Sequence, residues 1–161
     1  MFKKELLEQC LYPVTPKVKI GEDTAFTYPC LLAAESLAYV DGCLYHYRNN
    51  AQSMTAAFDP HLTETIFIPL DILRTYFDTD KRALFAQYQM YAAYLLQLWV
   101  RNQASLDCDL DRKGLRQSCA RVCQNQELRA LLASVPGALP RQVAVAVCAV
   151  QQQKPGQLYL L

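Results

Sequence analysis

The stretch LFAQYQMYAAYLLQLWVRN, residues 84–102, decides the fold class of this 161-residue chain. Its apolar side chains recur every three or four positions, at Leu84, Tyr88, Tyr91, Leu95 and Leu98. This is the spacing of one face of an α-helix. Phe85, Leu96 and Trp99 widen the apolar face, and a wide apolar face is more typical of a helix packed in a core than of a partner groove. We therefore expect a long buried helix that ends near Asn102.

Helical patterns continue on both sides of this stretch. Before it, Asp59-Pro60 predicts a helix start, because aspartate caps helices and proline fits the first helical position. Apolar positions then recur from Leu62 to Phe77, and Pro69 is expected to kink that helix. After it, shorter helices are expected at about 112–124, 126–134 and 140–153, with Pro136-Gly137 and Pro155-Gly156 as breakers.

The one β signal lies earlier in the chain. Leu37 to Val40 and Cys43 to Tyr47 flank Asp41-Gly42, and Asp-Gly between apolar runs is typical of a hairpin. Two strands alone are marginally stable in water, so a third strand or a covering helix would be needed. The expected fold class is therefore α+β, mostly α-helical, with a small hairpin or strand pair followed by a multi-helix C-terminal tail. The composition changes near residue 58, which predicts domains at 1–58 and 59–161.

The N-terminal region has its own helix signals. A short helical turn is expected at the start, followed by an extended connector that contains Pro13 and Pro16. Glu22-Asp23 then opens an apolar stretch that reaches Ala34, because acidic residues favour the first turn of a helix. Pro29 is expected to kink or split this helix.

Three motifs follow one another in this region. They are Gly21-Glu22-Asp23, Tyr45-His46-Tyr47-Arg48 and Ser53-Met54-Thr55. In this order, and with the helix between the first two, they resemble the C-terminal part of the catalytic domain of family 2 glycosyltransferases of the GT-A type. The resemblance covers roughly residues 1 to 58. It implies an inverting transfer of sugar from a nucleotide-sugar donor to a saccharide or cell-surface polymer acceptor.

The resemblance also implies roles for particular residues. Asp23 corresponds to the base that takes a proton from the acceptor hydroxyl. Glu22, Tyr45 and Tyr47 would contact the acceptor. Arg48 and Ser53 would bind the leaving diphosphate, for which the planar guanidinium of arginine is well suited.

The donor side of such an enzyme is not recognisable here. The family carries an Asp-x-Asp motif after a strand, upstream of the base, where it holds Mg²⁺ or Mn²⁺ on the donor diphosphate. The Asp-x-Asp strings of this chain all lie downstream, at 78–80, 107–109 and 109–111. We interpret them as helix caps and loops. The chain is thus expected to be inactive alone, to use the metal and the nucleotide sugar only with a donor-binding half, and to self-associate through uncovered apolar faces.

The composition bears on nucleic-acid binding, disorder, metal binding and localisation. A net charge of +1 argues against a nucleic-acid-binding surface, and 52% hydrophobic residues argue against disorder. The seven cysteines are scattered; Cys119 and Cys123 are one turn apart, but no second Cys or His pair completes a metal site. Reduced cysteines and the lack of a long apolar run predict a cytoplasmic protein, with peripheral contact at the inner membrane face left open.

Two other functional interpretations deserve comparison. Most of the chain after Asp59 lacks clustered polar residues, so a non-enzymatic helical protein-interaction module is the main alternative. A hydrolase that uses Glu22 and Asp23 as paired carboxylates is disfavoured, because adjacent helical residues point about 100° apart and cannot flank one bond.

Overall fold

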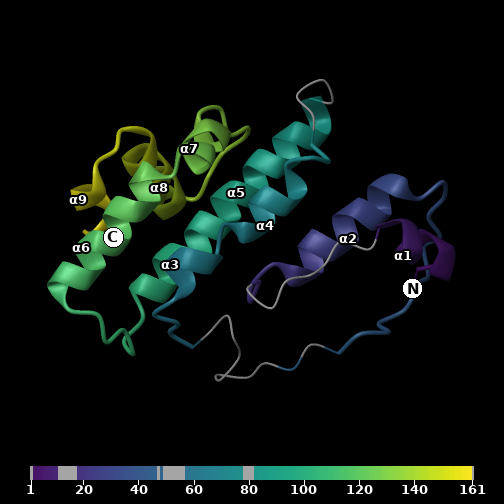
Figure 1. The fold of residues 1–161 in the computed structure, drawn as a ribbon, viewed down its shortest axis with the longest axis horizontal. Coiled ribbons are helices and arrows are strands. Elements are labelled where there is room, and N and C mark those ends of the chain that lie inside the picture. The colour runs from purple at the N-terminus through teal and green to yellow at the C-terminus, as the bar shows by residue number, and fades with distance from the viewer. Residues whose placement is uncertain (1, 11–17, 47, 49–56, 78–81, 161) are drawn as a thin grey trace.

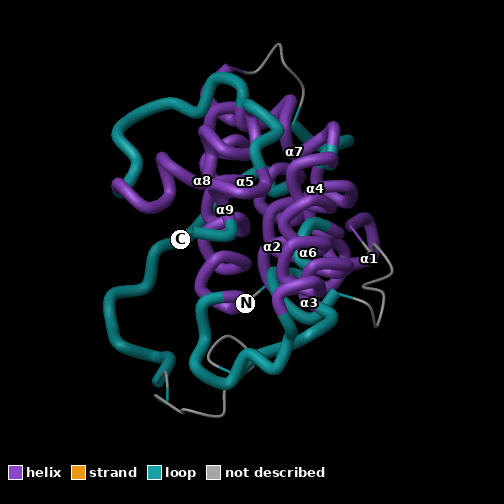
Figure 2. Tube along the Cα trace, turned by 90° about the vertical axis from the view of Figure 1, so that its left-hand side faces the viewer, coloured by secondary structure: helices purple, strands orange, loops and turns teal. Residues whose placement is uncertain are grey.

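A computed structural model describes residues 2–10, 18–46, 48, 57–77 and 82–160 of the chain. All regular secondary structure among these residues is helical, and Figure 2 shows helices and loops without a strand in the described part. The helices are α1 (Lys4–Cys10), α2 (Glu22–Ala33), α3 (Leu62–Thr65), α4 (Ile68–Leu73), α5 (Arg82–Gln103), α6 (Arg112–Gln124), α7 (Gln126–Leu132), α8 (Arg141–Gln151) and α9 (Pro155–Leu158). The predicted α+β class is therefore wrong, because no hairpin forms among the described residues.

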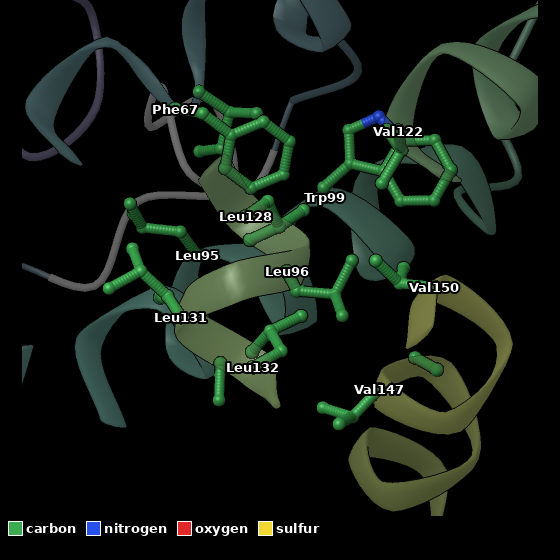
Figure 3. Packing of buried hydrophobic residues seen from close by; sticks show 14 of the residues in the cluster. Phe67, Leu95, Leu96, Trp99, Val122, Leu128, Leu131, Leu132, Val147 and Val150 are labelled. Carbon is green, nitrogen blue, oxygen red and sulfur yellow. The ribbon is translucent and has the colours of Figure 1, made fainter. Parts of the chain in front are cut away.

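Helix α5 lies at the centre of the bundle, with α3 and α4 along one side and α7 and α8 against another (Figure 1). Its Tyr88, Leu95, Leu96 and Trp99 are almost completely buried. Figure 3 shows Leu95, Leu96 and Trp99 packed with side chains from α6, α7 and α8. The wide apolar face predicted for this helix is thus core, and the helix ends at Gln103, one residue past the expected position.

Two side chains of α5, Trp99 and Gln89, also form hydrogen bonds with neighbouring elements. Trp99 Nε1 donates a hydrogen bond to Thr63 Oγ1 at 2.9 Å, which ties α5 to α3. Gln89, a buried polar residue, donates through Nε2 to Leu131 O and to Ser134 Oγ, each at 3.0 Å. Since a buried donor without a partner would cost about 1–3 kcal/mol, these bonds also fix how α5 and α7 are aligned.

The helical region begins two residues later than predicted, because the N-cap of α3 is His61 and neither Asp59 nor Pro60 holds the expected cap or first helical position. Asp59 Oδ1 accepts a hydrogen bond from the His61 amide at 2.9 Å, and α3 begins at Leu62. The chain does not continue as one helix to Phe77. It breaks at residues 66–67, and Pro69 lies in the first turn of α4, where its missing N–H costs nothing. The kink expected near Pro69 is therefore a helix boundary.

The C-terminal helices α6, α7 and α8 lie close to their expected positions. Asp111 and Asn125 cap two of them, because their side chains accept hydrogen bonds from the Gly114 and Leu128 amides at 2.7 and 2.9 Å. Gly137, in the expected break between α7 and α8, has a φ of 82°. The second expected breaker was Pro155-Gly156. Pro155 does separate α8 from α9, but it is also the first residue of α9, so the prediction is only partly confirmed.

The residues expected to form the hairpin are an extended, exposed stretch, which we call the 35–46 segment. It runs from the end of α2 along the outside of the helices (Figure 1). Gly42 has a φ of 148° and Asp41 a negative φ, so the pair does not form the two-residue turn that needs positive φ at both positions. The physical reason is that no other described element covers these side chains, and two strands by themselves gain too little burial.

Helix α2 joins this N-terminal region to the bundle. It runs through Pro29 without a break, so the predicted split is absent. Its Ala25 packs with Val18 and with Ile72 of α4 in a small second cluster, and Tyr28 reaches the main core. Helix packing therefore crosses the boundary predicted near residue 58, although the division into domains 1–58 and 59–161 itself stays a prediction.

Candidate functional site

The predicted base, Asp23, lies exposed in the first turn of α2. Its Oδ1 accepts a hydrogen bond from the Thr24 amide at 2.7 Å and a longer one from the Thr24 hydroxyl at 3.3 Å. Glu22 is half-buried one position earlier. Both carboxylates are therefore in the first turn of the helix, next to its positive dipole end. An exposed carboxylate fixed at a helix start is able to accept a proton from a bound hydroxyl group.

The turn into α2 requires glycine at position 21. Gly21 has a φ of 84°, a left-handed conformation that residues with a side chain adopt at a cost. A Cβ added there would meet the Tyr91 hydroxyl from α5 and would lie 3.2 Å from Pro69 Cγ of α4. The first residue of the Gly-Glu-Asp motif is thus explained by close packing between the start of α2 and the bundle, with or without a catalytic role for the motif.

Tyr91 is the bundle residue closest to this turn. Burial raises the pKa of its hydroxyl well above the usual range, the negative charges of Asp23 and Glu22 add to the rise, and the nearby Thr24 hydroxyl opposes it. Within the described part of the chain, no group meets hydrogen-bond geometry with this hydroxyl, so we regard Thr24 as a neighbour rather than a bonded partner. Tyr91 therefore stays neutral and packs against the motif.

The remaining predicted site residues belong to the next two motifs. Tyr45 and Arg48 are exposed, in or just after the 35–46 segment. Tyr47 and Ser53 lie outside the described residues. The structure therefore places Glu22 and Asp23 at one helix end, and the roles predicted for all six residues stay predictions.

Metal-binding groups are not clustered in the part of the chain that is described. No three His, Cys, Asp or Glu side chains gather there in a way that could hold an ion. Of the Asp-x-Asp strings, 78–80 lies outside the described residues, 107–109 lies in the loop before α6, and Asp111 caps α6 as predicted. All seven cysteines are free thiols, and burial raises the pKa of the Cys119 thiol to about 11.

A second candidate site, which the sequence did not reveal, is a pocket of about 580 Å³ between the turn that follows α4, helix α5 and helix α7. We call it the aromatic pocket. Three rings lie close together in its wall: Phe77 stacks on Tyr88 with centroids 5.0 Å apart, and Phe85 meets Tyr88 edge-on at 6.4 Å. Tyr88 is held in place because its hydroxyl donates to Leu70 O at 2.6 Å. The pocket residues are Arg74, Thr75, Phe77, Phe85, Tyr88, Gln126, Glu127, Ala130 and Leu131.

Charged groups meet at one edge of the aromatic pocket. Arg74 Nη1 lies 3.7 Å from Glu127 Oε1, which is too long for a hydrogen bond, and this buried oxygen has no hydrogen-bond partner among the described residues. Burial raises the pKa of Glu127, the neighbouring Asp71 carboxyl raises it further, and Arg74 opposes the rise. The aromatic residues at 77, 85 and 88 were the only sequence signal for this site, and they had been assigned to core.

Comparison with known proteins adds no family. No protein-family model, no curated protein and no solved structure matches the chain. A search of the described helices for a membrane span found none that is both long and apolar enough to cross a bilayer.

Proposed function

We propose that this chain carries the acceptor-side part of an inverting glycosyltransferase, in which Asp23 is the base. Asp23 would take the proton from an acceptor hydroxyl as its oxygen attacks the anomeric carbon and the bond to the nucleotide diphosphate breaks. The observation that carries this proposal is the exposed Asp23 carboxylate in the first turn of α2, directly after a glycine turn. Arg48 and Ser53 would stabilise the departing diphosphate, and Glu22, Tyr45 and Tyr47 would contact the saccharide acceptor.

The 35–46 segment supports the same proposal from packing. Leu37 is 73% exposed and Leu44 79% exposed, and the backbone of the segment is extended. An extended apolar stretch gains stability when it joins a sheet, because its amides then form hydrogen bonds and its apolar side chains are buried. A donor-binding half with a β-sheet would supply that partner, together with the nucleotide sugar and its Mg²⁺ or Mn²⁺. The donor-binding half would also be required for activity, so the chain alone should be inactive.

The first experiment tests the need for that half. The reading frame upstream of Met1 is examined for an in-frame strand followed by Asp-x-Asp, and the 161-residue chain alone is assayed with several nucleotide sugars and Mn²⁺. We expect the upstream motif and no turnover above background. Turnover by the chain alone would contradict the proposed dependence on a second half.

The second experiment tests Asp23 in the whole enzyme. Asp23→Asn should lower kcat by about 10²–10⁴-fold, the usual contribution of a general base, with little change in donor affinity. Glu64→Gln on the bundle surface is the matched control, because it also removes one exposed carboxylate, and it should leave kcat unchanged. If Asp23→Asn keeps kcat within a few-fold of the wild type, Asp23 is not the base.

The second candidate function is a helical protein-interaction module. It is favoured by the exposed apolar side chains of the 35–46 segment, which could contact another protein as well as a second half of an enzyme. A reading frame that begins at Met1, together with an inactive chain, would favour this function. Peripheral contact with the inner face of a cytoplasmic membrane remains part of either proposal.

A further inference from the structure

Two buried cysteines lie where α1 packs on α2. Cys10 is the last residue of α1, and Cys30 is in the second half of α2. Cys10 is 8% exposed and Cys30 is completely buried. The Cys10 thiol donates a hydrogen bond to Pro29 O at 3.7 Å, and the carbonyl group of Pro29 is bonded to the Cys30 nitrogen. The Cys10 sulfur is therefore one peptide unit away from Cys30.

The two thiols also act on each other directly. Burial raises the pKa of the Cys30 thiol, and the neighbouring Cys10 thiol raises it further. Both cysteines are free in this structure. Cys119 and Cys123 are another close pair, but they belong to one helix, α6, and the Cys123 thiol donates to Ala149 O inside the main core. A bond between Cys10 and Cys30 would instead join two separate helices.

We propose that Cys10 and Cys30 are a redox-sensitive pair, which a small-molecule disulfide such as oxidised glutathione converts reversibly into a disulfide between α1 and α2. The Cys10 thiolate attacks one sulfur of glutathione disulfide, which forms a mixed disulfide and releases one glutathione. The Cys30 thiolate then attacks the Cys10 sulfur, breaks the mixed disulfide and releases the second glutathione. The protein thiols lose two electrons and two protons, and one glutathione disulfide becomes two thiols.

The oxidant reaches this buried pair when α1 opens. The helix has only seven residues, too few to be stable without its contacts to α2, so it opens more easily than the bundle does. Once formed, the disulfide closes the loop of residues 10–30 and holds α1 against α2, the helix whose first turn contains Asp23. The proposal does not depend on a catalytic role for Asp23.

The test is a redox titration of the wild-type chain in buffers with graded ratios of reduced to oxidised glutathione. The reaction is quenched with acid, free thiols are blocked with N-ethylmaleimide, and disulfide-linked peptides are identified by mass spectrometry. We expect a Cys10–Cys30 link in the folded chain, and a mixture of pairings when the same oxidation is carried out in urea. A folded chain that pairs other cysteines, or that remains reduced or only glutathionylated at the most oxidising ratio, would overturn the proposal.

Thermal unfolding of the reduced and oxidised chains shows whether the bond fits the native fold. Oxidation should raise the midpoint by about 5–10 °C, because the disulfide constrains the unfolded chain. Cys10→Ser should abolish this rise. The matched control is Cys43→Ser, which removes an exposed thiol of the 35–46 segment and should keep the rise. An unchanged or lower midpoint in the oxidised wild type, or a rise that persists in Cys10→Ser, would overturn the proposal.

Discussion

Residues 62–158 and the 35–46 segment differ in the burial of their apolar side chains. In the first region Leu95, Leu96, Leu128 and Leu132 are fully buried in one cluster, whereas in the second Leu37 and Leu44 remain mostly in water. Burial contributes about 25 cal/mol for each Å² of apolar surface, so only the first region gains from its leucines. The main hydrophobic core is thus built from the helices after residue 61, and the enzyme-like motifs lie in the part of the chain before them.

Helix α2 is where the two regions meet. Ala25 packs on Ile72, Gly21 fits under Tyr91, and Lys19 pairs with Asp59 at 3.0 Å. Asp23 therefore sits on a helix anchored to the bundle, while the 35–46 segment, which follows that helix, has no such support. The comparison teaches that the helix carrying the motif glycine and the motif carboxylates is anchored to the bundle.

The largest expected effect contrasts two leucines. Leu96→Ala removes a fully buried side chain from the core and should lower the free energy of unfolding by about 2–5 kcal/mol. Leu44→Ala removes one that is 79% exposed and should change it by less than about 0.5 kcal/mol. Urea unfolding followed by circular dichroism measures both. A large loss of unfolding free energy in Leu44→Ala would show that the 35–46 segment is packed in solution. The two regions would then no longer differ in the burial of their leucines.

The next effect concerns two glycines with similar backbones. Gly21→Ala and Gly137→Ala both place a side chain at a left-handed φ, 84° and 82°, which costs about 1–2 kcal/mol. Only Gly21 has a neighbour in the way, because no atom lies within 4 Å of a Cβ at position 137. Gly21→Ala should therefore lower the free energy of unfolding by more than Gly137→Ala does.

Tyr91→Phe sharpens this comparison of glycines. It removes the hydroxyl that a Cβ at position 21 would meet, so Gly21→Ala should be less destabilising in the Tyr91→Phe background than in the wild type. A double-mutant cycle by urea unfolding measures the coupling. Independent, additive effects would mean that the turn into α2 does not rest on Tyr91, and the anchoring of the motif by the bundle would then need another explanation.

The sequence predicted the bundle well, and for a clear reason. Its helices have local signals: apolar spacing in α5, the caps Asp111 and Asn125, and the breaker at Pro136-Gly137. Such signals depend only on neighbours within a few residues, so they predict a helix correctly whatever the rest of the fold is. The break between α3 and α4 was less visible, because Pro69 can either kink a helix or begin one.

The hairpin prediction failed because strands depend on distant partners. Asp41-Gly42 between apolar runs is a strong local signal, yet the described residues offer no third strand or covering helix. The aromatic pocket was missed for a related reason. Phe85 and Tyr88 have the spacing of core residues, and the sequence cannot show that Glu127, about 40 residues later, meets them on α7.

A smaller effect should come from Asp59, which pairs with Lys19 and so links the residues before α2 to the start of the bundle. Although burial favours its neutral form, the hydrogen bonds from Lys19 Nζ and the His61 amide lower the pKa of this carboxyl below the usual value. A lowered pKa means that ionised Asp59 stabilises the fold above the pKa of the unfolded chain. This contribution is lost as the pH falls through the folded-state pKa.

Asp59→Asn tests this link between Lys19 and the start of the bundle. The variant should lower the free energy of unfolding by about 1 kcal/mol at neutral pH, and the difference from wild type should disappear in acid, at pH values below both pKa values. Glu64→Gln, which breaks an exposed pair with Arg121, is the matched control and should cost less than about 0.5 kcal/mol. A difference that persists in acid would assign the effect to altered packing instead of charge.

The smallest effect on stability, but a visible one on association, is expected from Tyr39, which is 89% exposed in the 35–46 segment. If uncovered apolar side chains of this segment attract a second copy of the chain, the wild type should self-associate with rising concentration in sedimentation, and Tyr39→Ser should weaken that association. It should leave the urea midpoint unchanged, because the side chain is not packed in the monomer. Leu106→Ser is the control, since Leu106 is also fully exposed but stands singly in the loop before α6. A monomeric wild type at high concentration, or equal effects of the two variants, would show that exposure alone does not make the 35–46 segment adhesive, and the case for a missing partner would then rest on the motifs alone.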